Sequence, residues 1–491
     1  MEITIGKFTL ETLTSGMYER PRDIYREYIQ NAVDSIDIAI AESMIKAEKA
    51  KIEIEIEKEK QSIKISDNGT GIGTKNAVKY LLDIGHSPKR FTNARGFRGI
   101  GRLAGLAYCD TLIFETSALG EDKRTIIEFD AKTLCERMLN ENIDIDLLSL
   151  ISDVVTVKTE QETRSSHYFN VIMSGVEDTD DILDIENVRQ YLEQVAPVDF
   201  DKEFGWGKIV KSKLRVFGFT PSSYNIFISD GNERCQIIKA YRDTFISDRL
   251  RKLDDSVFEI ETREFTYNGE TVAYLWFAKT SFFGTLQNEA IKGIRIRKGN
   301  ILIGDKTTLN HAFKDERFNG WLFGELHILS DRLIPNARRD EMEKNAAYSS
   351  MIADLRSWAD AISCEIRKIS NQRSSDKKAQ KIIEYAQNET TPDIETTTTV
   401  VVPEVALITK SETEQVNHTD LVTALDILIG TQQSSTKYKA LNLQSNITVE
   451  QKKVLERVFD IMCGDDIDQK SNALITKIIR EFIPKPIAYA R

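Results

Sequence analysis

The sequence predicts an α+β protein built from more than one domain. Isoleucines that alternate with charged residues, as within residues 51–67, have the period of two that half-buried strands show. Apolar residues at helical spacing, as at Ile24, Tyr28, Ala32 and Ile36, predict amphipathic helices between such strands. The chain has 491 residues, which is too many for one ordinary domain. Together these observations favour antiparallel or mixed sheets with helices on one face.

The first domain is expected over residues 1–210. Its main helix is predicted to begin at Pro21, because proline suits a first helical turn, and to end near Glu48. The other predicted elements, in order, are a short strand within residues 1–20, a hairpin over 51–67, a helix from Thr74 to Ile84, a strand over 111–116, strands within 125–175 and a helical connector over 176–210.

A second α+β domain is predicted over residues 211–370. The dipeptide Gly299-Asn300 lies between two strand-like runs and predicts a hairpin, and a helix over residues 348–370 is expected to leave the domain. Residues 371–416 are polar, with four consecutive threonines, and are assigned to a flexible linker. Residues 417–491 show apolar helical periodicity and predict a small helical module.

The composition favours a soluble protein of the reducing cytoplasm. No apolar run reaches membrane-spanning length, and the first residues lack the apolar core of a signal peptide. The five cysteines are far apart and form no CxxC pair, so neither a disulfide framework nor a zinc site is indicated. The net charge of -11 argues against a general coating of nucleic acid, although it allows a local basic patch.

One helical face carries an unusual set of polar residues. Glu27, Asn31 and Asp34 are four and three residues apart, so they lie on the same side of the predicted helix. Such a face is either a solvated surface or a polar cluster that holds a metal ion and a water molecule. The helix alone does not decide between these interpretations.

Two glycine-rich segments follow. Gly69, Gly71 and Gly73 end the predicted hairpin, and Gly96, Gly99 and Gly101 precede another helix, where backbone N–H groups favour phosphate. Each segment alone is a weak signal. No Walker lysine follows the second one, and the glycines do not close a first βαβ unit, which argues against P-loop and Rossmann proteins.

The order of these segments resembles the GHKL ATPase superfamily and its Bergerat ATP-binding fold. Residues 27–105 hold, in sequence, a helix with E-x-x-x-N-A-x-D, a hairpin, DNGTGIG, a helix, GHSPK and GFRGIGR. The superfamily contains type II topoisomerases, heat-shock chaperones, histidine kinases, mismatch-repair MutL and MORC ATPases. The pattern is most similar to the chaperone, MORC and MutL types. The resemblance implies an N-terminal α/β sandwich that binds ATP and Mg²⁺.

The resemblance also implies a role for individual residues. Glu27 would be the general base for the attacking water, and Asn31 would bind Mg²⁺ through its amide oxygen. Asp34 would lie near the nucleotide, and Asp67 would accept a hydrogen bond from the adenine amino group. The other nucleotide-binding residues that the resemblance implies are Gly69, Gly71, Ile72, Ser87, Lys89, Gly96, Gly99, Ile100 and Gly101.

The sequence departs from the superfamily at one place and extends the resemblance at another. No Gly-Thr occurs within residues 164–176, where Ser165 or Ser166 are candidates to support the adenine-binding aspartate. The hairpin around residues 293–303 resembles that of the MORC and MutL transducer domain. Residues 334–340 resemble the chaperone segment that sends an arginine to the γ-phosphate. Arg339 is the catalytic candidate and Arg338 the second choice, and a surface Arg–Asp pair is the alternative interpretation.

These features favour an Mg²⁺-dependent ATPase that closes as a homodimeric clamp when ATP binds, through residues 1–20 and the loop with Ser87 and Lys89, which resembles an ATP lid. Arg339 is expected to reach the nucleotide only if the second domain swings onto it. The client would be a macromolecule, either DNA or protein. Basic candidates for DNA contact are Arg295, Arg297, Lys298 and the tract Arg367–Lys381, for which an ordinary solvated surface is the alternative interpretation.

Two other functions stay open, a heat-shock-type protein chaperone and a nucleotide sensor in a multi-protein system such as genome defence. Histidine kinases and topoisomerases fit less well, because neither a phosphoacceptor helix before the first motif nor a cleaving tyrosine module is evident.

Overall fold

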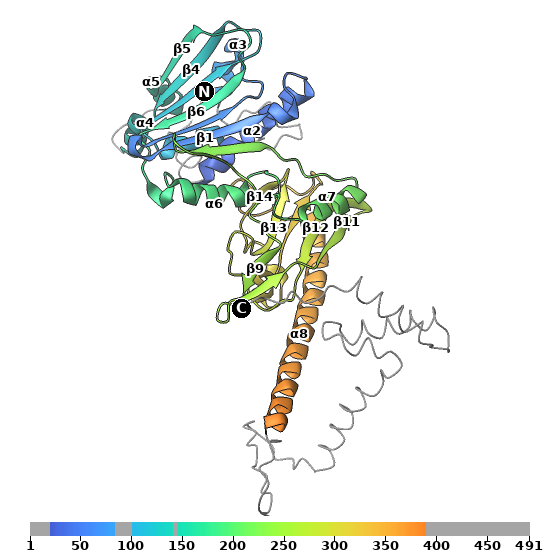
Figure 1. Ribbon diagram of the computed structural model, residues 1–491. Helices are drawn as coiled ribbons and strands as arrows, with labels where there is room; N and C mark the ends of the chain where they lie inside the picture. Colours follow the sequence, from blue (N-terminus) through green and yellow to red (C-terminus); the bar gives the residue numbers. More distant parts are fainter. Residues whose placement is uncertain (1–19, 84–100, 141–145, 389–491) are drawn as a thin grey trace, which may run out of the picture. The chain divides into compact units, whose positions relative to one another are not determined.

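The computed structural model describes residues 20–83, 101–140 and 146–388 (Figure 1). All of these residues belong to one compact unit of the chain. The predicted helical module over residues 417–491 therefore lies outside the described residues, as does most of the predicted linker.

The first sheet has eight strands within the described residues, in the order β5-β4-β3-β6-β2-β1-β7-β8. Its neighbouring strands are antiparallel except β1 and β7, which are parallel. The prediction of an antiparallel or mixed sheet is thus confirmed. The strands are β1 (Lys51–Glu57), β2 (Ser62–Asp67), β3 (Thr111–Ser117), β4 (Lys123–Asp130), β5 (Val155–Gln161), β6 (Tyr168–Ser174), β7 (Asn225–Ser229) and β8 (Arg234–Gln236).

The hairpin of β1 and β2 forms as the sequence predicts. Ile54 pairs with Ile65 and Ile56 pairs with Ile63, so the isoleucines of both strands share the buried face. Gln61 reverses the chain in the left-handed conformation, with φ of 48°. The period of two therefore sets which face of the sheet enters the core.

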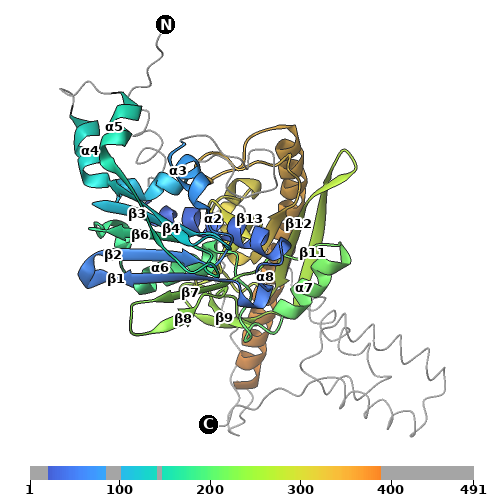
Figure 2. The same ribbon diagram turned by 90° about the horizontal axis from the view of Figure 1, so that it is seen from above.

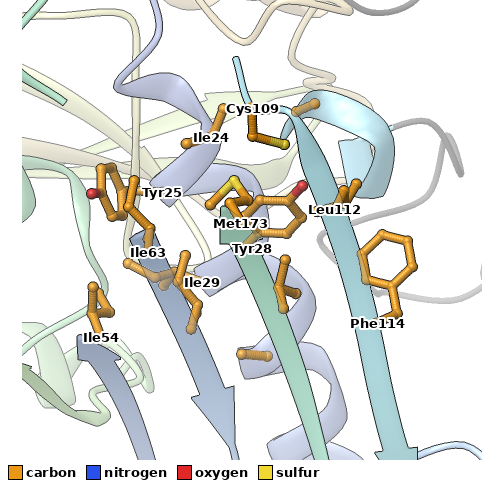
Figure 3. Packing of buried hydrophobic residues seen from close by; sticks show 14 of the residues in the cluster. Ile24, Tyr25, Tyr28, Ile29, Ile54, Ile63, Cys109, Leu112, Phe114 and Met173 are labelled. Atoms are coloured by element: carbon orange, nitrogen blue, oxygen red, sulfur yellow. The ribbon is translucent and has the colours of Figure 1, made fainter. Parts of the chain in front are cut away.

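Helices cover the isoleucine face of this sheet. The central one is α2 (Asp23–Ala41), whose Tyr25, Tyr28 and Ile29 pack against the strands in Figure 3. It ends at Ala41 rather than near Glu48, because the chain turns at Ser43 with φ of 59°. The other helical segments of this region are η1 (Ala47–Lys49), η2 (Lys58–Lys60), α3 (Thr74–Leu82), η3 (Gly101–Ala107), α4 (Ala131–Leu139), α5 (Leu147–Val154), η4 (Thr179–Asp181) and α6 (Ile185–Val195).

The predicted boundary at residue 210 does not separate the two sheets. Helix α7 (Gly207–Val216) packs on strands of the second sheet, but the chain then returns as β7 and β8 to extend the first. Ile226 and Ile228 of β7 are buried beside Ile52 and Ile54 of β1, and this burial fixes the strand there. The first sheet thus includes residues assigned from sequence to the second domain.

The second sheet has the order β11-β12-β15-β13-β14 among the described residues. Gly299 and Asn300 join β13 to β14 with φ of 57° and 62°, a turn with two left-handed residues that suits a tight hairpin. This confirms the predicted hairpin. The strands and short helices of the region are β9 (Thr244–Ser247), β10 (Leu253–Ser256), β11 (Glu259–Tyr267), β12 (Glu270–Lys279), β13 (Gly293–Lys298), β14 (Ile301–Ile303), η5 (Asn310–Ala312), η6 (Glu316–Trp321) and β15 (Phe323–Ile328).

A long helix, α8 (Ala346–Asn388), leaves the second sheet (Figures 1 and 2). Its first half is anchored by buried Met351, Leu355 and Trp358. The helix continues through residues 371–388, which the sequence analysis assigned to the linker. That segment contains neither glycine nor proline and is rich in lysine, glutamine and alanine, all good helix formers. No helix in the described ranges is long and apolar enough to cross a membrane.

Candidate functional site

The polar face of α2 is largely enclosed. Glu27 and Asp34 are only 6% and 4% exposed, while Asn31 between them is partly exposed. A solvated surface would not bury two carboxylates, because the charged form pays a desolvation cost that specific partners must offset. The structure therefore favours the polar-cluster interpretation of this face.

The DNGTGIG loop lies directly against this helix. Ser35 Oγ, one residue after Asp34, accepts a hydrogen bond from the backbone N–H of Thr70 at 3.0 Å. A Cβ atom added to Gly69 would lie 2.2 Å from the same oxygen. Asp67 Oδ1 accepts the N–H of Gly69 at 2.8 Å, which turns the chain toward the helix. The packing thus brings the second predicted motif beside the first.

Gly71 is required by its backbone and by its neighbours. Its φ is +62°, and an added Cβ would lie 1.8 Å from the carbonyl oxygen of Ser117. The N–H of Ile72 donates to Thr116 Oγ1 at 2.8 Å. The backbone of Gly71 therefore lies directly against strand β3, and this contact fixes the path of the loop.

Two residues that the sequence analysis did not select hold this loop. Thr116 is fully buried, and its hydroxyl donates to Tyr168 O at 3.0 Å while accepting from Ile72. His167 Nδ1 donates to Gly69 O at 2.6 Å. By contrast, the Ser166 hydroxyl contacts Glu162 and Thr163. Thr116 lies at the end of the strand predicted over 111–116, but only the pairing of β3 with β6 shows that it faces the loop.

The phosphate-loop candidates are described only in part. Ser87, Lys89, Gly96, Gly99 and Ile100 lie outside the described residues, whereas Gly101 begins η3.

Helix η3 is joined to α2 through Tyr28. Its hydroxyl accepts the N–H of Gly105 at 3.0 Å and donates to the carbonyl of Arg102 at 3.1 Å. Burial lowers the pKa of Arg102 to about 10, and its Nε donates to Leu81 O at 3.1 Å. These contacts place the start of η3 on the helix that carries Glu27.

Arg339 lies beside the predicted general base. Its Nε is 3.4 Å from Glu27 Oε1, and both side chains are buried. Arg338, the second choice, has an exposed side chain. The interpretation as a surface Arg–Asp pair is wrong for Arg339, because its partner is a buried carboxylate on α2. The contact joins the loop after the second sheet to α2, and the expected swing of the second domain onto a nucleotide stays a prediction.

The basic residues proposed for DNA contact on β13 are mostly inside the protein. Arg295 and Arg297 are each 1% exposed. Arg297 forms an ion pair with Glu325 and donates to Gln194 O at 2.7 Å. Lys298 donates to backbone carbonyls at Ser330 and Leu333. The hypothesis that this strand presents a basic binding surface is therefore wrong, since its charged side chains donate to acceptors within the fold.

The residues on α2 suit a sparsely liganded hard cation. Within the described ranges, no group of three or more His, Cys, Asp or Glu side chains is placed to hold a metal ion. Mg²⁺ commonly takes one or two protein oxygens and completes its shell with water and phosphate. The partly exposed amide of Asn31, one turn from Glu27, fits that requirement.

The comparisons with known proteins agree with this geometry. Residues 25–169 match the family described as histidine kinase-, DNA gyrase B-, and HSP90-like ATPase. No curated protein matches the chain. The matched segment begins two residues before Glu27 and contains both glycine-rich motifs. Residues 25–169 therefore form an ATP-binding GHKL-like ATPase domain.

Proposed function

We propose that this chain hydrolyses ATP with Mg²⁺ and works as a nucleotide-operated dimeric clamp on a macromolecular client. The observation that carries the proposal is the 3.4 Å approach of Arg339 Nε to Glu27 Oε1. Glu27 belongs to the ATPase domain, and Arg339 follows the second sheet. A site assembled from both regions makes hydrolysis depend on how they are docked, which a clamp requires.

The residues present can divide the chemistry among them. Glu27 would accept the proton of the attacking water, for which a carboxylate within hydrogen-bond reach is needed. Arg339 would stabilise the charge that develops on the transferred phosphoryl group. Asn31 would hold the Mg²⁺ ion, which neutralises phosphate charge when bound. Asp67 would select adenine, because its carboxylate only accepts hydrogen bonds at neutral pH.

The general-base role is tested by replacing Glu27. Glu27→Ala is expected to leave ATP affinity within about threefold and to lower turnover by about 10²–10⁴-fold, the usual contribution of a general base. Phosphate release measures turnover, and calorimetry measures binding. Glu42→Ala is the matched control, because Glu42 is exposed at the end of the same helix. Turnover that stays close to the parent would remove Glu27 from the mechanism.

The client of the proposed clamp is either DNA or a protein. With β13 excluded, the described basic candidates for nucleic-acid phosphate lie on α8, where Arg367, Lys368, Lys377, Lys378 and Lys381 are exposed. Exposed charges on a helix bind DNA in a strongly salt-dependent way. Stimulation of turnover by duplex DNA should therefore fall steeply as salt rises.

The clamp itself is tested with a non-hydrolysable ATP analogue. Sedimentation velocity is expected to show a monomer without the analogue and a dimer with it. Turnover measured with duplex DNA and with an unfolded protein then separates the candidate clients. Stimulation by unfolded protein alone would indicate a chaperone. A monomer in both states, with neither client active, would leave a nucleotide sensor.

A further inference from the structure

Arg26 makes contacts that the proposed mechanism does not use. It precedes Glu27 on α2, and its side chain is only 5% exposed. Its Nη2 donates to the backbone carbonyl of Arg338 at 3.0 Å. The same guanidinium lies 3.6 Å from Asp23 Oδ2 and 3.7 Å from Glu27 Oε1. A buried guanidinium with this set of partners is held in one geometry.

The carbonyl that Arg26 holds belongs to the peptide group just before Arg339. The N–H of that peptide group is the N–H of Arg339, which donates to Asn336 O at 3.2 Å. On the other side, Arg339 O accepts the N–H of Gly304 at 2.8 Å. Both peptide planes that flank the Cα of Arg339 are therefore tethered, and the direction of its side chain follows from them.

The backbone of Arg339 needs this support. Its φ is +58°, in the left-handed region that residues with a Cβ rarely occupy. Such a conformation persists only where the surroundings fix it. Without the tether at Arg338, the residue is expected to relax toward ordinary backbone angles, and its side chain would turn away from Glu27.

Arg26 is itself anchored on the ATPase side. Its partner Asp23 accepts a hydrogen bond from the hydroxyl of Tyr191, on α6, at 2.9 Å. Two helices beside the first sheet, α2 and α6, thus support the guanidinium, which in turn holds the loop from the second sheet. Contacts from α2 and α6 therefore hold the guanidinium, and the guanidinium holds the loop.

We propose that Arg26 is a positioning residue, which holds the peptide group before Arg339 so that the Arg339 side chain faces Glu27. The proposal rests on the proposed function for what Arg339 does in catalysis. Its structural part concerns the loop alone and is measurable without nucleotide.

The first test is hydrogen exchange in the nucleotide-free chain. Arg26→Met keeps the aliphatic stem and removes every donor. The amides of Arg339 and Gly304 are expected to exchange at least about tenfold faster in this variant, because a hydrogen bond from a charged group is lost. Arg22→Ala is the matched control, since Arg22 pairs with Asp180 at 2.8 Å at the start of the same helix. Unchanged exchange in a folded Arg26→Met protein would overturn the proposal.

A second variant covers the case in which Arg26→Met does not fold. Arg26→Lys keeps the charge beside Asp23 but cannot span Asp23 and Arg338 with one planar group. Exchange at Arg339 is again expected to rise by several-fold, and parent-like exchange would contradict the proposal.

The second test is a double-mutant cycle on turnover. If Arg26 acts through Arg339, Arg26→Met combined with Arg339→Ala loses no more turnover than Arg339→Ala alone, and ATP affinity is unchanged throughout. Losses that multiply would show that Arg26 acts on Glu27 directly, which refutes the positioning role. Failure of Glu27→Ala to affect turnover would refute the proposed function while leaving the exchange result interpretable.

Discussion

Loss of Glu325 should weaken the contacts that join the second sheet to α6 and to Lys239, which lies shortly after β8. Glu325 is fully buried on β15, and both its oxygens accept hydrogen bonds from Lys239 Nζ, at 2.9 and 2.8 Å. Arg297 also forms an ion pair with Glu325, and the same guanidinium donates to the backbone carbonyl of Gln194, in the last turn of α6. Glu325→Gln removes one negative charge and leaves Lys239 and Arg297 in the interior.

The substitution is expected to destabilise the fold because it removes the negative partner and leaves the two positive partners buried. Breaking a buried ion pair by deleting one partner typically costs about 3–5 kcal/mol, because the remaining charge stays desolvated. Lys239 can relieve part of the cost, since burial and the neighbouring Arg297 lower its pKa to about 7. Arg297 has no such escape, because guanidinium groups stay protonated. We therefore expect a loss of about 3 kcal/mol, a large share of the 5–15 kcal/mol typical of folded proteins.

Urea unfolding followed by circular dichroism and tryptophan fluorescence measures this loss. Trp276 reports on the site directly, since its Nε1 donates to Glu325 Oε2 at 3.3 Å. Glu289→Gln serves as the control, because Glu289 is 55% exposed and pairs with Lys292 and Lys306 at the surface. That substitution should cost less than about 1 kcal/mol. A loss of the same small size for Glu325→Gln would refute the argument that this cluster stabilises the fold through charge pairing.

Three further predictions concern the loop at Gly71, the pH dependence of stability and the recognition of adenine. Gly71→Ala should destabilise the protein by about 1–3 kcal/mol more than Gly120→Ala in thermal unfolding, because both positions need positive φ but only at Gly71 would the new Cβ overlap a backbone oxygen; equal effects would contradict this. The folded pKa of Lys239 is about 7 and its unfolded value near 10.5, so between them the unfolded chain binds the extra proton. The free energy of unfolding of the parent should therefore rise between pH 7 and pH 9, by up to about 1.4 kcal/mol per pH unit. The Lys239→Met variant should show no such rise, and a parent profile that is flat over this range would contradict the assignment to Lys239. Asp67→Asn should weaken ATP binding by about tenfold in calorimetry, since an amide can present a donor to the adenine amino group, whereas equal parental affinity for ATP and GTP would argue against this contact.

The sequence by itself determined the elements whose signals are local. The isoleucine alternation over residues 51–67 and the Gly299-Asn300 turn each specify a hairpin through neighbouring residues, and both hairpins form. The polar face of α2 and the two glycine-rich motifs were likewise readable, because helical spacing and backbone freedom are properties of short segments. The order of these motifs resembles the GHKL ATPases, and this resemblance predicted an ATPase domain, which the family match over residues 25–169 supports.

The tertiary structure alone decided what depends on distant partners. Arg295 and Arg297 alternate with isoleucines as solvent-facing residues would, yet they are buried because Gln194 and Glu325 supply acceptors from elsewhere in the chain. Strand β7 looks like part of the second domain, but its pairing with β1 places it in the first sheet.

The approach of Arg339 to Glu27 is of the same kind. The resemblance of residues 334–340 to a chaperone segment names Arg339 as a candidate, but a pattern of neighbouring residues does not specify a contact with a residue more than three hundred positions away. That contact exists because packing brings the loop to the helix, where the tether from Arg26 holds a backbone conformation that local preferences disfavour.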